Sequence, residues 1–200
     1  YIDPPFATKQ EFRGSEDQKA YQDKVSGAQF LEFIRKRLVL IREIMSDDGV
    51  VFVHTDWKKG HYIKLLLDEI LGESRFRNEI VWWYYNKMQG NVNRFPSNHE
   101  TIFFYSVGNS FFFEPQFVER EEGTRRLLKR VWDSNAGKLV NARNNNGELI
   151  YIESDDRRID DVWRLPMLQP ADQSENYGYP TQKPETLIAI ILAAASRPGD

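Results

Sequence analysis

The clearest indication of the fold comes from the segment Asp47-Asp48-Gly49-Val50-Val51-Phe52-Val53. Its last four residues form an apolar run rich in β-branched side chains, which is too short for a helix and typical of a strand buried on both faces. The preceding Asp47-Asp48-Gly49 forms a helix stop. Before that stop, apolar residues recur at helical spacing over residues 28–45. The stretch therefore predicts a helix that is followed by a buried strand.

Further helices and strands are predicted on both sides of this unit. A second helix is expected over residues 62–71, where Gly72 ends it, and a last helix over residues 184–195 with Pro184 in its first turn. Aromatic and β-branched content predicts strands over residues 79–85 and 101–105. In the first of these, Trp82, Trp83, Tyr84 and Tyr85 are interpreted as core and strand-pairing residues. Strand, helix, strand, helix, strand is the pattern of an α/β doubly wound sheet.

The region of residues 109–160 interrupts this rhythm. It has mixed charge, contains Asn144-Asn145-Asn146-Gly147 and shows no clean period, so it is interpreted as an inserted, irregular or small β region. The expected organisation is an α/β part over residues 1–108, the insert over 109–160, and a return to the α/β part over 161–200.

Composition limits the class of protein but leaves its function open. Hydrophobic residues make up 40% and charged residues 28% of the chain, which indicates a soluble globular protein, and no run approaches the roughly 20 apolar residues of a membrane span. Zero cysteines exclude a disulfide framework, a thiol nucleophile and a cysteine zinc site. A cytoplasmic location is expected. The net charge of −3 argues against a wholly electrostatic DNA binder, although a local basic face remains compatible with DNA.

Both ends of the chain look cut. Tyr1-Ile2-Asp3 is interpreted as the end of a strand, and Arg197-Pro198-Gly199-Asp200 as a turn that leads into another element. The sequence is therefore expected to be an internal fragment.

Asp3-Pro4-Pro5-Phe6 is the sharpest chemical signal. A ring-attached amine is a poor nucleophile because its lone pair is conjugated into the ring, and acceptors aimed at both N–H bonds can free that lone pair. A carboxylate and a backbone carbonyl supply two such acceptors, two prolines fix φ and remove competing donors, and an aromatic ring can stack on a flipped base. The site would lie at the carboxyl end of a strand, where open α/β sheets bind ligands. The alternative is a plain strand-ending turn.

Five blocks in sequence order resemble one family. The blocks are Tyr1-Ile2-Asp3-Pro4-Pro5-Phe6, Asp48-Gly49-Val50-Val51-Phe52-Val53-His54-Thr55-Asp56, Phe76-Arg77-Asn78-Glu79-Ile80-Val81-Trp82, His99-Glu100-Thr101-Ile102-Phe103-Phe104-Tyr105-Ser106 and Gly178-Tyr179-Pro180-Thr181-Gln182-Lys183-Pro184-Glu185. They are similar to DNA N6-adenine and N4-cytosine amino-methyltransferases of the β motif order, as in type III modification methylases. The resemblance implies a Rossmann-like S-adenosylmethionine-dependent methyltransferase sheet with an inserted target-recognition region.

The resemblance also implies roles for individual residues. Asp3 and the carbonyl of Pro4 would accept from the target amine, next to Pro5, and Phe6 would stack on the flipped base. Four residues of the last block would lie against the methyl donor together with Asp3: Thr181, Gln182, Lys183 and Pro184. A lysine and a helix N-terminus both suit the carboxylate of the donor. The alternative for Lys183 is a solvated lysine at a helix start.

A basic cluster in the insert occupies the target-recognition position of the family. The residues expected to contact DNA are Arg120, Arg125, Arg126, Lys129, Arg130, Arg157 and Arg158. Phosphate contacts would supply affinity, and side chains that reach base edges would supply specificity. The alternative is an ordinary charged helix face, because Glu119, Glu121 and Glu122 are interleaved.

His54 and Asp56 end a strand on the rim that carries Asp3. A metal site would want a third ligand, and His61 and His99 have no ligand-like spacing, so no metal is assigned. A structural or pocket-lining role is favoured over proton transfer.

The expected reaction is direct methyl transfer to N6 of adenine in double-stranded DNA, because Asp rather than Ser begins the tetrapeptide. N4-cytosine methylation, protein glutamine methylation and a non-catalytic DNA-binding relic are the alternatives. The glycine-rich donor motif of the family would lie beyond Asp200, so the 200 residues alone are expected to be inactive. A restriction subunit as a partner and a homodimer are compatible with the family, and the sequence does not decide them.

Overall fold

The computed structural model describes residues 1–6, 11–13, 19–22, 27–87, 90, 93–169, 171, 172, 174–179 and 181–199. The chain divides into two compact units. The first, here called the α/β unit, comprises Tyr1–Glu114 and Asp160–Asp200, and the second, here called the β-arm, comprises Pro115–Ile159. Within the described residues, no helix combines the length and the apolar character that crossing a membrane requires.

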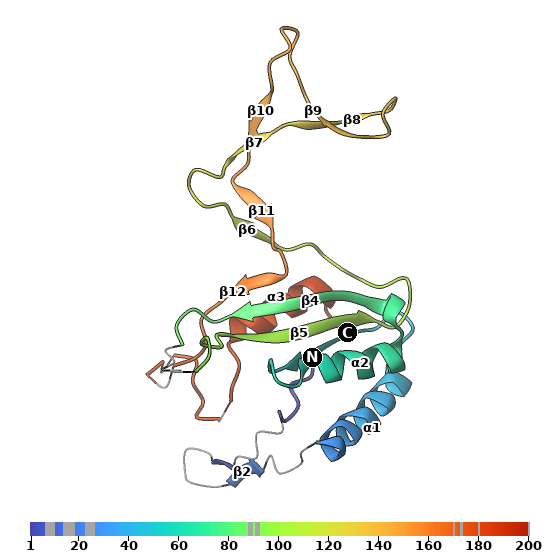
Figure 1. Cartoon of the computed structure of the whole chain (residues 1–200), viewed down its shortest axis with the longest axis vertical. Coiled ribbons are helices and arrows are strands. Elements are labelled where there is room, and N and C mark those ends of the chain that lie inside the picture. Colours follow the sequence, from blue (N-terminus) through green and yellow to red (C-terminus); the bar gives the residue numbers. More distant parts are fainter. Residues whose placement is uncertain are drawn as a thin grey trace. The chain divides into compact units, whose positions relative to one another are not determined.

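A four-stranded mixed sheet forms the centre of the α/β unit (Figure 1). Its order is β12 (Val162–Arg164), β4 (Phe76–Trp83), β5 (His99–Ser106) and β3 (Val50–Thr55). Strand β5 is antiparallel to both of its neighbours, whereas β12 is parallel to β4. The first residues of the chain extend the sheet beyond β3, because Ile2 forms a parallel bridge with Val53. The amide of Ile2 donates to the carbonyl of Phe52, and the amide of His54 donates to the carbonyl of Ile2, each at 2.8 Å.

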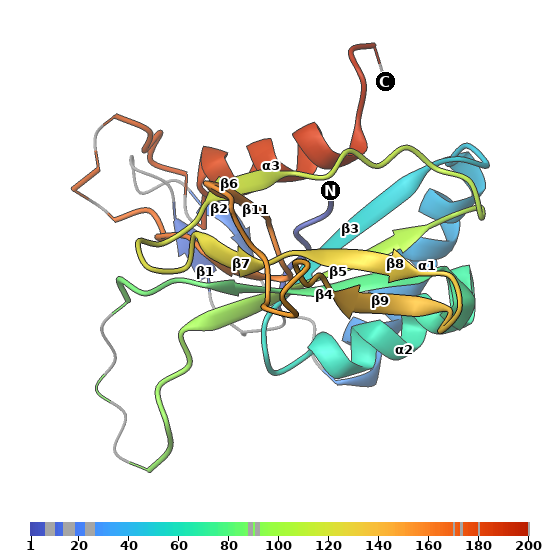
Figure 2. The same ribbon diagram turned by 90° about the horizontal axis from the view of Figure 1, so that it is seen from above.

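Helices cover both faces of this sheet. Figure 2 shows α1 (Ala28–Ile44) and α2 (Gly60–Leu71) on one side and α3 (Glu185–Ala195) on the other. A short 3-10 turn, η1 (Glu73–Arg75), joins α2 to β4. The main core lies under α1 and α2 and consists of Phe30, Ile34, Leu38, Val51, Val53, Ile63, Leu67, Phe103 and Tyr105. On the opposite face, the rings of Phe52 and Phe104 stack with their centroids 4.4 Å apart.

The α/β unit also contains a small antiparallel hairpin of β1 (Glu11–Arg13) and β2 (Lys19–Gln22) between Phe6 and α1. Three antiparallel two-stranded ribbons make up the β-arm, and none of its described residues is helical. They pair β6 (Phe117–Glu119) with β11 (Asp156–Arg158), β7 (Arg126–Leu128) with β10 (Tyr151–Glu153), and β8 (Arg130–Asp133) with β9 (Lys138–Asn141).

The main predicted elements are confirmed, and three details differ. The sheet is mixed because β5 follows β4 in the chain and pairs with it antiparallel, and none of the described residues between them is helical. Pro184 precedes α3 with extended backbone instead of occupying its first turn. The alternative of a charged helix face for the basic cluster is wrong, since these residues lie in or beside β-strands.

Candidate active site

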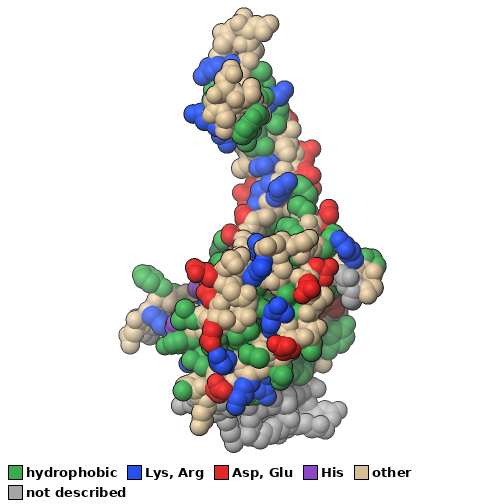
Figure 3. Space-filling model, turned by 90° about the vertical axis from the view of Figure 1, so that its right-hand side faces the viewer, with side chains coloured by type: hydrophobic (Ala, Val, Ile, Leu, Met, Phe, Trp, Pro, Cys, Tyr) green, Lys and Arg blue, Asp and Glu red, His purple; other side chains and the backbone are tan. Residues whose placement is uncertain are grey.

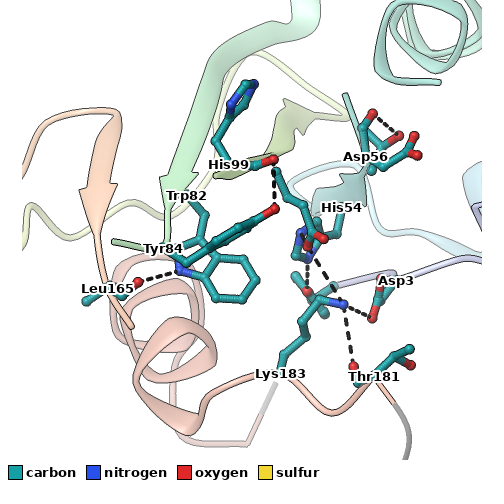
Figure 4. Close-up of polar contacts among 12 residues, drawn as sticks. Asp3, His54, Asp56, Trp82, Tyr84, His99, Leu165, Thr181 and Lys183 are labelled. Carbon is teal, nitrogen blue, oxygen red and sulfur yellow. Dashed lines mark hydrogen bonds and ion pairs between the residues drawn. The ribbon is translucent and has the colours of Figure 1, made fainter. Parts of the chain in front are cut away.

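Polar side chains from four parts of the α/β unit meet at one end of the sheet (Figure 4). Asp3 comes from the segment beside β3, His54 from β3, Glu100 from the start of β5, and Lys183 from the loop before α3. Because side chains alternate along a strand, Ile2 packs against the core while Tyr1 and Asp3 point away from it. The same alternation sends Val53 into the core and His54 toward the site.

Lys183 is the cation of this cluster. Its Nζ lies 3.0 Å from Oδ2 of Asp3 and 3.9 Å from Oε2 of Glu100. The Lys183 side chain keeps only 12% of its exposure, compared with 26% for Asp3 and 21% for Glu100. Its Nζ also lies 5.5 Å from the centroid of the Phe6 ring. Lys183 therefore joins the two carboxylates and the aromatic ring of the tetrapeptide, and it is not a solvated surface lysine.

His54 is completely buried and contacts two groups of the site. The Tyr1 hydroxyl is hydrogen-bonded to its Nδ1, and its Nε2 lies 2.8 Å from Oε2 of Glu100. Burial, together with the negative charges of Asp3 and Glu100, raises the pKa of the Tyr1 hydroxyl well above its usual range. That hydroxyl stays protonated and lies against Nδ1 of His54, while Nε2 of the same ring faces the Glu100 carboxylate.

Glu100 is a half-buried carboxylate that its neighbours keep ionised. Burial acts to raise the pKa of Glu100, but the contact with His54 and the positive charge of Lys183 outweigh this effect and leave the pKa below its usual value. Two carboxylates, Asp3 and Glu100, thus surround one ammonium group.

Asp56 lies just past the end of β3 and has a structural contact. Its Oδ1 accepts from the amide of Lys59 at 2.9 Å, in the turn that leads into α2. Burial raises the pKa of Asp56 above its usual value, although this hydrogen bond acts in the opposite direction.

The block before α3 is held mainly by its own side chains. Gln182 donates from Nε2 to the carbonyl of Glu175 at 2.8 Å and accepts at Oε1 from the amide of Tyr177 at 3.0 Å. The carboxylate of Glu175 also accepts from the amide of Glu185, so the first turn of α3 is capped from within the chain. Thr181 has a φ of 69°, in the left-handed region that β-branched residues rarely adopt.

Some of the expected site residues come together and others do not. Asp3 and Phe6 lie beside Lys183, and Nζ of Lys183 donates to the carbonyl of Thr181 at 3.5 Å. Gln182 instead contacts its own loop, and Pro184 is buried at the start of α3. Pro4 and Pro5 are half-buried between Asp3 and Phe6. The expected DNA contacts all lie in the β-arm: Arg120, Arg125, Arg126, Lys129, Arg130, Arg157 and Arg158.

The aromatic residues at the end of β4 lie alternately on a buried face and on an exposed face. Trp82 is buried, and its Nε1 donates to the carbonyl of Leu165 at 3.1 Å. Tyr84 is buried, and its hydroxyl donates to the carbonyl of His99 at 3.2 Å. Trp83 and Tyr85 are exposed instead of forming core, and the Arg164 guanidinium lies over both rings, 5.5 Å and 4.4 Å from their centroids.

Glu100 is the site residue that the sequence analysis missed. It was quoted only as part of a matching block, although an acidic residue at the start of an otherwise apolar strand is a usable signal. The alternation of β5 places Glu100 on the face of Ile102, which pairs with His54. The sequence therefore predicts the face of β5 on which Glu100 lies, but only the register of β5 against β3 shows that this face meets His54.

The acidic and aromatic cluster lies at one end of the strands of a helix-flanked sheet, and this is where open α/β sheets bind their ligands. The sequence model described as DNA methylase matches residues 1–200, and the chain belongs to this family. The Type II methyltransferase M.EcaI of Enterobacter cloacae is 39% identical over 111 residues, which are 56% of this chain and 25% of that protein. The EcoP15I Mod subunit of a type III restriction-modification enzyme of Escherichia coli is 29% identical over 172 residues, 74% of this chain and 24% of that protein.

The fold has a solved counterpart. The cytosine-N4-specific PvuII DNA methyltransferase superposes with a TM-score of 0.57 over 99% of this chain and 63% of its own, at 10% identity. This likeness shows the α/β methyltransferase fold. The chain spans about a quarter of the length of the two curated relatives it matches.

Proposed function

We propose that the protein is a DNA methyltransferase that transfers the methyl group of S-adenosylmethionine to N6 of adenine. The observation that carries the proposal is the placement of the tetrapeptide. Asp3 and Phe6 lie at the carboxyl end of β3, next to a lysine that holds the Asp3 carboxylate at 3.0 Å. Membership of the DNA methylase family supports the same reaction.

The charge of the site fits the proposed donor. The group to be transferred sits on a sulfonium, which is a cation, and the site presents two carboxylates against one ammonium beside an aromatic face. When bound, S-adenosylmethionine supplies an electrophilic methyl group. Thr181, Gln182, Lys183 and Pro184 are the residues proposed to form one wall of its site, with Asp3 between donor and base.

The residues of the chain activate the amine. The Asp3 carboxylate accepts one N–H of the adenine amino group, and the carbonyl of Pro4 accepts the other. Asp3 and the Pro4 carbonyl would thereby free the nitrogen lone pair to form the N–C bond to the methyl group that the bound donor would supply, as the S–C bond of the donor breaks. Phe6 stacks on the flipped base and holds it in place. The extra proton leaves to solvent after transfer, so no general base and no covalent enzyme intermediate are required.

Cytosine N4 is the alternative acceptor, because the same two acceptors serve either amine. The Asp at the first position of the tetrapeptide favours adenine. Double-stranded DNA is the proposed substrate, with the basic residues of the β-arm as its contacts. A restriction subunit is a proposed partner, since one relative is the Mod subunit of a restriction-modification enzyme, and homodimerisation is left to measurement.

The test uses the full-length protein, unmethylated DNA and S-adenosylmethionine labelled in its methyl group. The DNA is digested to nucleosides and the labelled base is identified. Asp3→Ala should abolish the label, while Asp48→Ala, an exposed carboxylate on the turn before β3, should leave it unchanged. Label in N6-methyladenine supports the proposal, and label in N4-methylcytosine corrects the base. Absence of label, with donor binding intact, would overturn the proposed activity.

A further inference from the structure

The outermost ribbon of the β-arm presents one face whose side chains match what protein strands use to read DNA. In the pair of β8 and β9, Arg130 lies opposite Asn141 and Trp132 lies opposite Leu139. Residues two apart on a strand share a face, so these four side chains lie together. All four are exposed, Trp132 to 66% and Leu139 to 49%. Trp132 thus leaves most of its ring surface to solvent.

The opposite face of the ribbon has a different character. It carries Val131 opposite Val140 and Asp133 opposite Lys138. Val140 and Asp133 are half-buried, and Oδ1 of Asp133 accepts from the amides of Asn135 and Ala136, which forms the turn between the strands. This face therefore contributes to the structure of the ribbon. On the face of Trp132, the Arg130 guanidinium donates to the carbonyl of Leu139 at 3.2 Å, while the Trp132 and Leu139 side chains are exposed and available to a partner.

Charge complementarity indicates which partner. Although the whole chain has a net charge of −3, residues 124–147 hold six basic residues and one acidic residue. The basic residues are Arg125, Arg126, Lys129, Arg130, Lys138 and Arg143, and the acidic one is Asp133. On the side of the molecule seen in Figure 3, Lys and Arg side chains lie beside hydrophobic ones toward the end of the arm. Such a basic segment suits a polyanion.

We propose that the ribbon of β8 and β9 enters a groove of the DNA with its Trp132 face, and that Arg130 and Asn141 read base edges there. The inference rests on the proposed function. A two-stranded ribbon fits the major groove, where Arg pairs with guanine and Asn with adenine through two hydrogen bonds each. Trp132 and Leu139 supply the apolar contact between these polar residues. In this arrangement Arg130 determines sequence specificity, whereas the sequence alone predicts only that it contacts DNA.

The two faces of the ribbon offer matched variants. Arg130→Gln and Lys138→Gln each remove one positive charge, from opposite faces of the same ribbon. The full-length protein is titrated, at one fixed salt concentration, against a duplex that it methylates and against a duplex of equal length that it does not. Arg130→Gln and Asn141→Ala should each lower the ratio of the two affinities by about tenfold, and methylation should spread to related sequences. Lys138→Gln should weaken binding to both duplexes by one common small factor.

Several outcomes separate this proposal from the proposed function. An unchanged affinity ratio in both Arg130→Gln and Asn141→Ala, with methylation retained, would overturn the ribbon proposal alone. If the wild-type protein methylates no DNA, the proposed activity falls. Total DNA affinity of Trp132→Ala against Val131→Ala then decides the ribbon, since only the former should lose binding. Thermal unfolding of each variant identifies any that fails to fold. Because Arg130 and Asn141 are exposed, their substitutions should leave the fold intact, so the affinity ratio can be measured even if another variant fails to fold.

Discussion

Removing the charge of Lys183 should destabilise the folded protein by an amount that depends on pH. In Lys183→Met, Asp3 and Glu100 both lose their cation. At an effective dielectric constant of about 20, one unit pair at 3.0 Å is worth roughly 5 kcal/mol. The net loss is smaller, because Asp3 and Glu100 keep 26% and 21% of their exposure and can be hydrated in the variant. We expect a loss of about 2 kcal/mol at pH 7, between the values for an exposed and a buried ion pair.

The direction of the pH dependence follows from Glu100. Its pKa in the folded protein lies below the usual value of 4.5, owing to His54 and Lys183 acting against burial. A carboxylate with a lowered pKa contributes stability that is complete above the unfolded pKa and is lost as the pH falls through the folded pKa. Lys183→Met removes part of this contribution. The difference in unfolding free energy between wild type and variant should therefore be largest near pH 7 and shrink below about pH 4.

Urea denaturation of the full-length protein between pH 7.5 and 3.5 measures this difference. Lys36→Met is the matched control, because Lys36 forms an exposed ion pair with Glu32 at 3.5 Å, with side chains 70% and 53% exposed. That control should cost less than about 0.5 kcal/mol at every pH. The reasoning is wrong if Lys183→Met costs no more than the control, or if its cost is the same at pH 7 and pH 3.5.

Three further substitutions test the packing and backbone of the α/β unit, each by chemical denaturation. Tyr105→Phe keeps a fully buried ring but removes the hydrogen bond from its hydroxyl to Oδ1 of Asp68 at 2.6 Å, and should cost about 1 to 2 kcal/mol. Leu187→Ala empties a fully buried position in α3 and should cost about 2 to 5 kcal/mol. In Thr181→Gly, glycine adopts the φ of 69° without strain, so the substitution should stabilise the protein by about 1 kcal/mol. A loss of stability would show that the threonine side chain makes a contact worth more than the strain.

The sequence predicted α1, β3, α2, β4, β5 and α3 because their apolar side chains follow a helical or strand pattern, whereas the short strands β1, β2 and β12 were not predicted. Phe30, Ile34 and Leu38 recur at helical spacing and face the sheet, and the apolar run of β3 is covered on both faces. The β-arm gave no such signal. Its ribbons have three or four residues per strand and leave most side chains exposed, so no apolar period develops that a sequence pattern could reveal.

The residues of the candidate site likewise divide into those that the sequence identifies and those that only the structure reveals. Asp3, Phe6 and Lys183 belong to short motifs with a chemical meaning of their own, so each could be named from the sequence. Glu100 could not, because its role depends on a partner 46 positions earlier, His54, and on the register that aligns their strands. Likewise, no local pattern reveals that Gln182 contacts its own loop through Glu175.

Register also explains how one pair of strands fixes both the core and the site. On β3 and β5, Val53 and Phe103 face α1 and α2, while His54 and Glu100 face the site. A slip of β5 by one residue would turn Phe103 out of the core and carry Glu100 to the wrong face. The apolar packing that stabilises the sheet therefore also holds the carboxylate of Glu100 beside His54 and within reach of Lys183. The geometry around Asp3 is accordingly set by hydrophobic residues that never touch it.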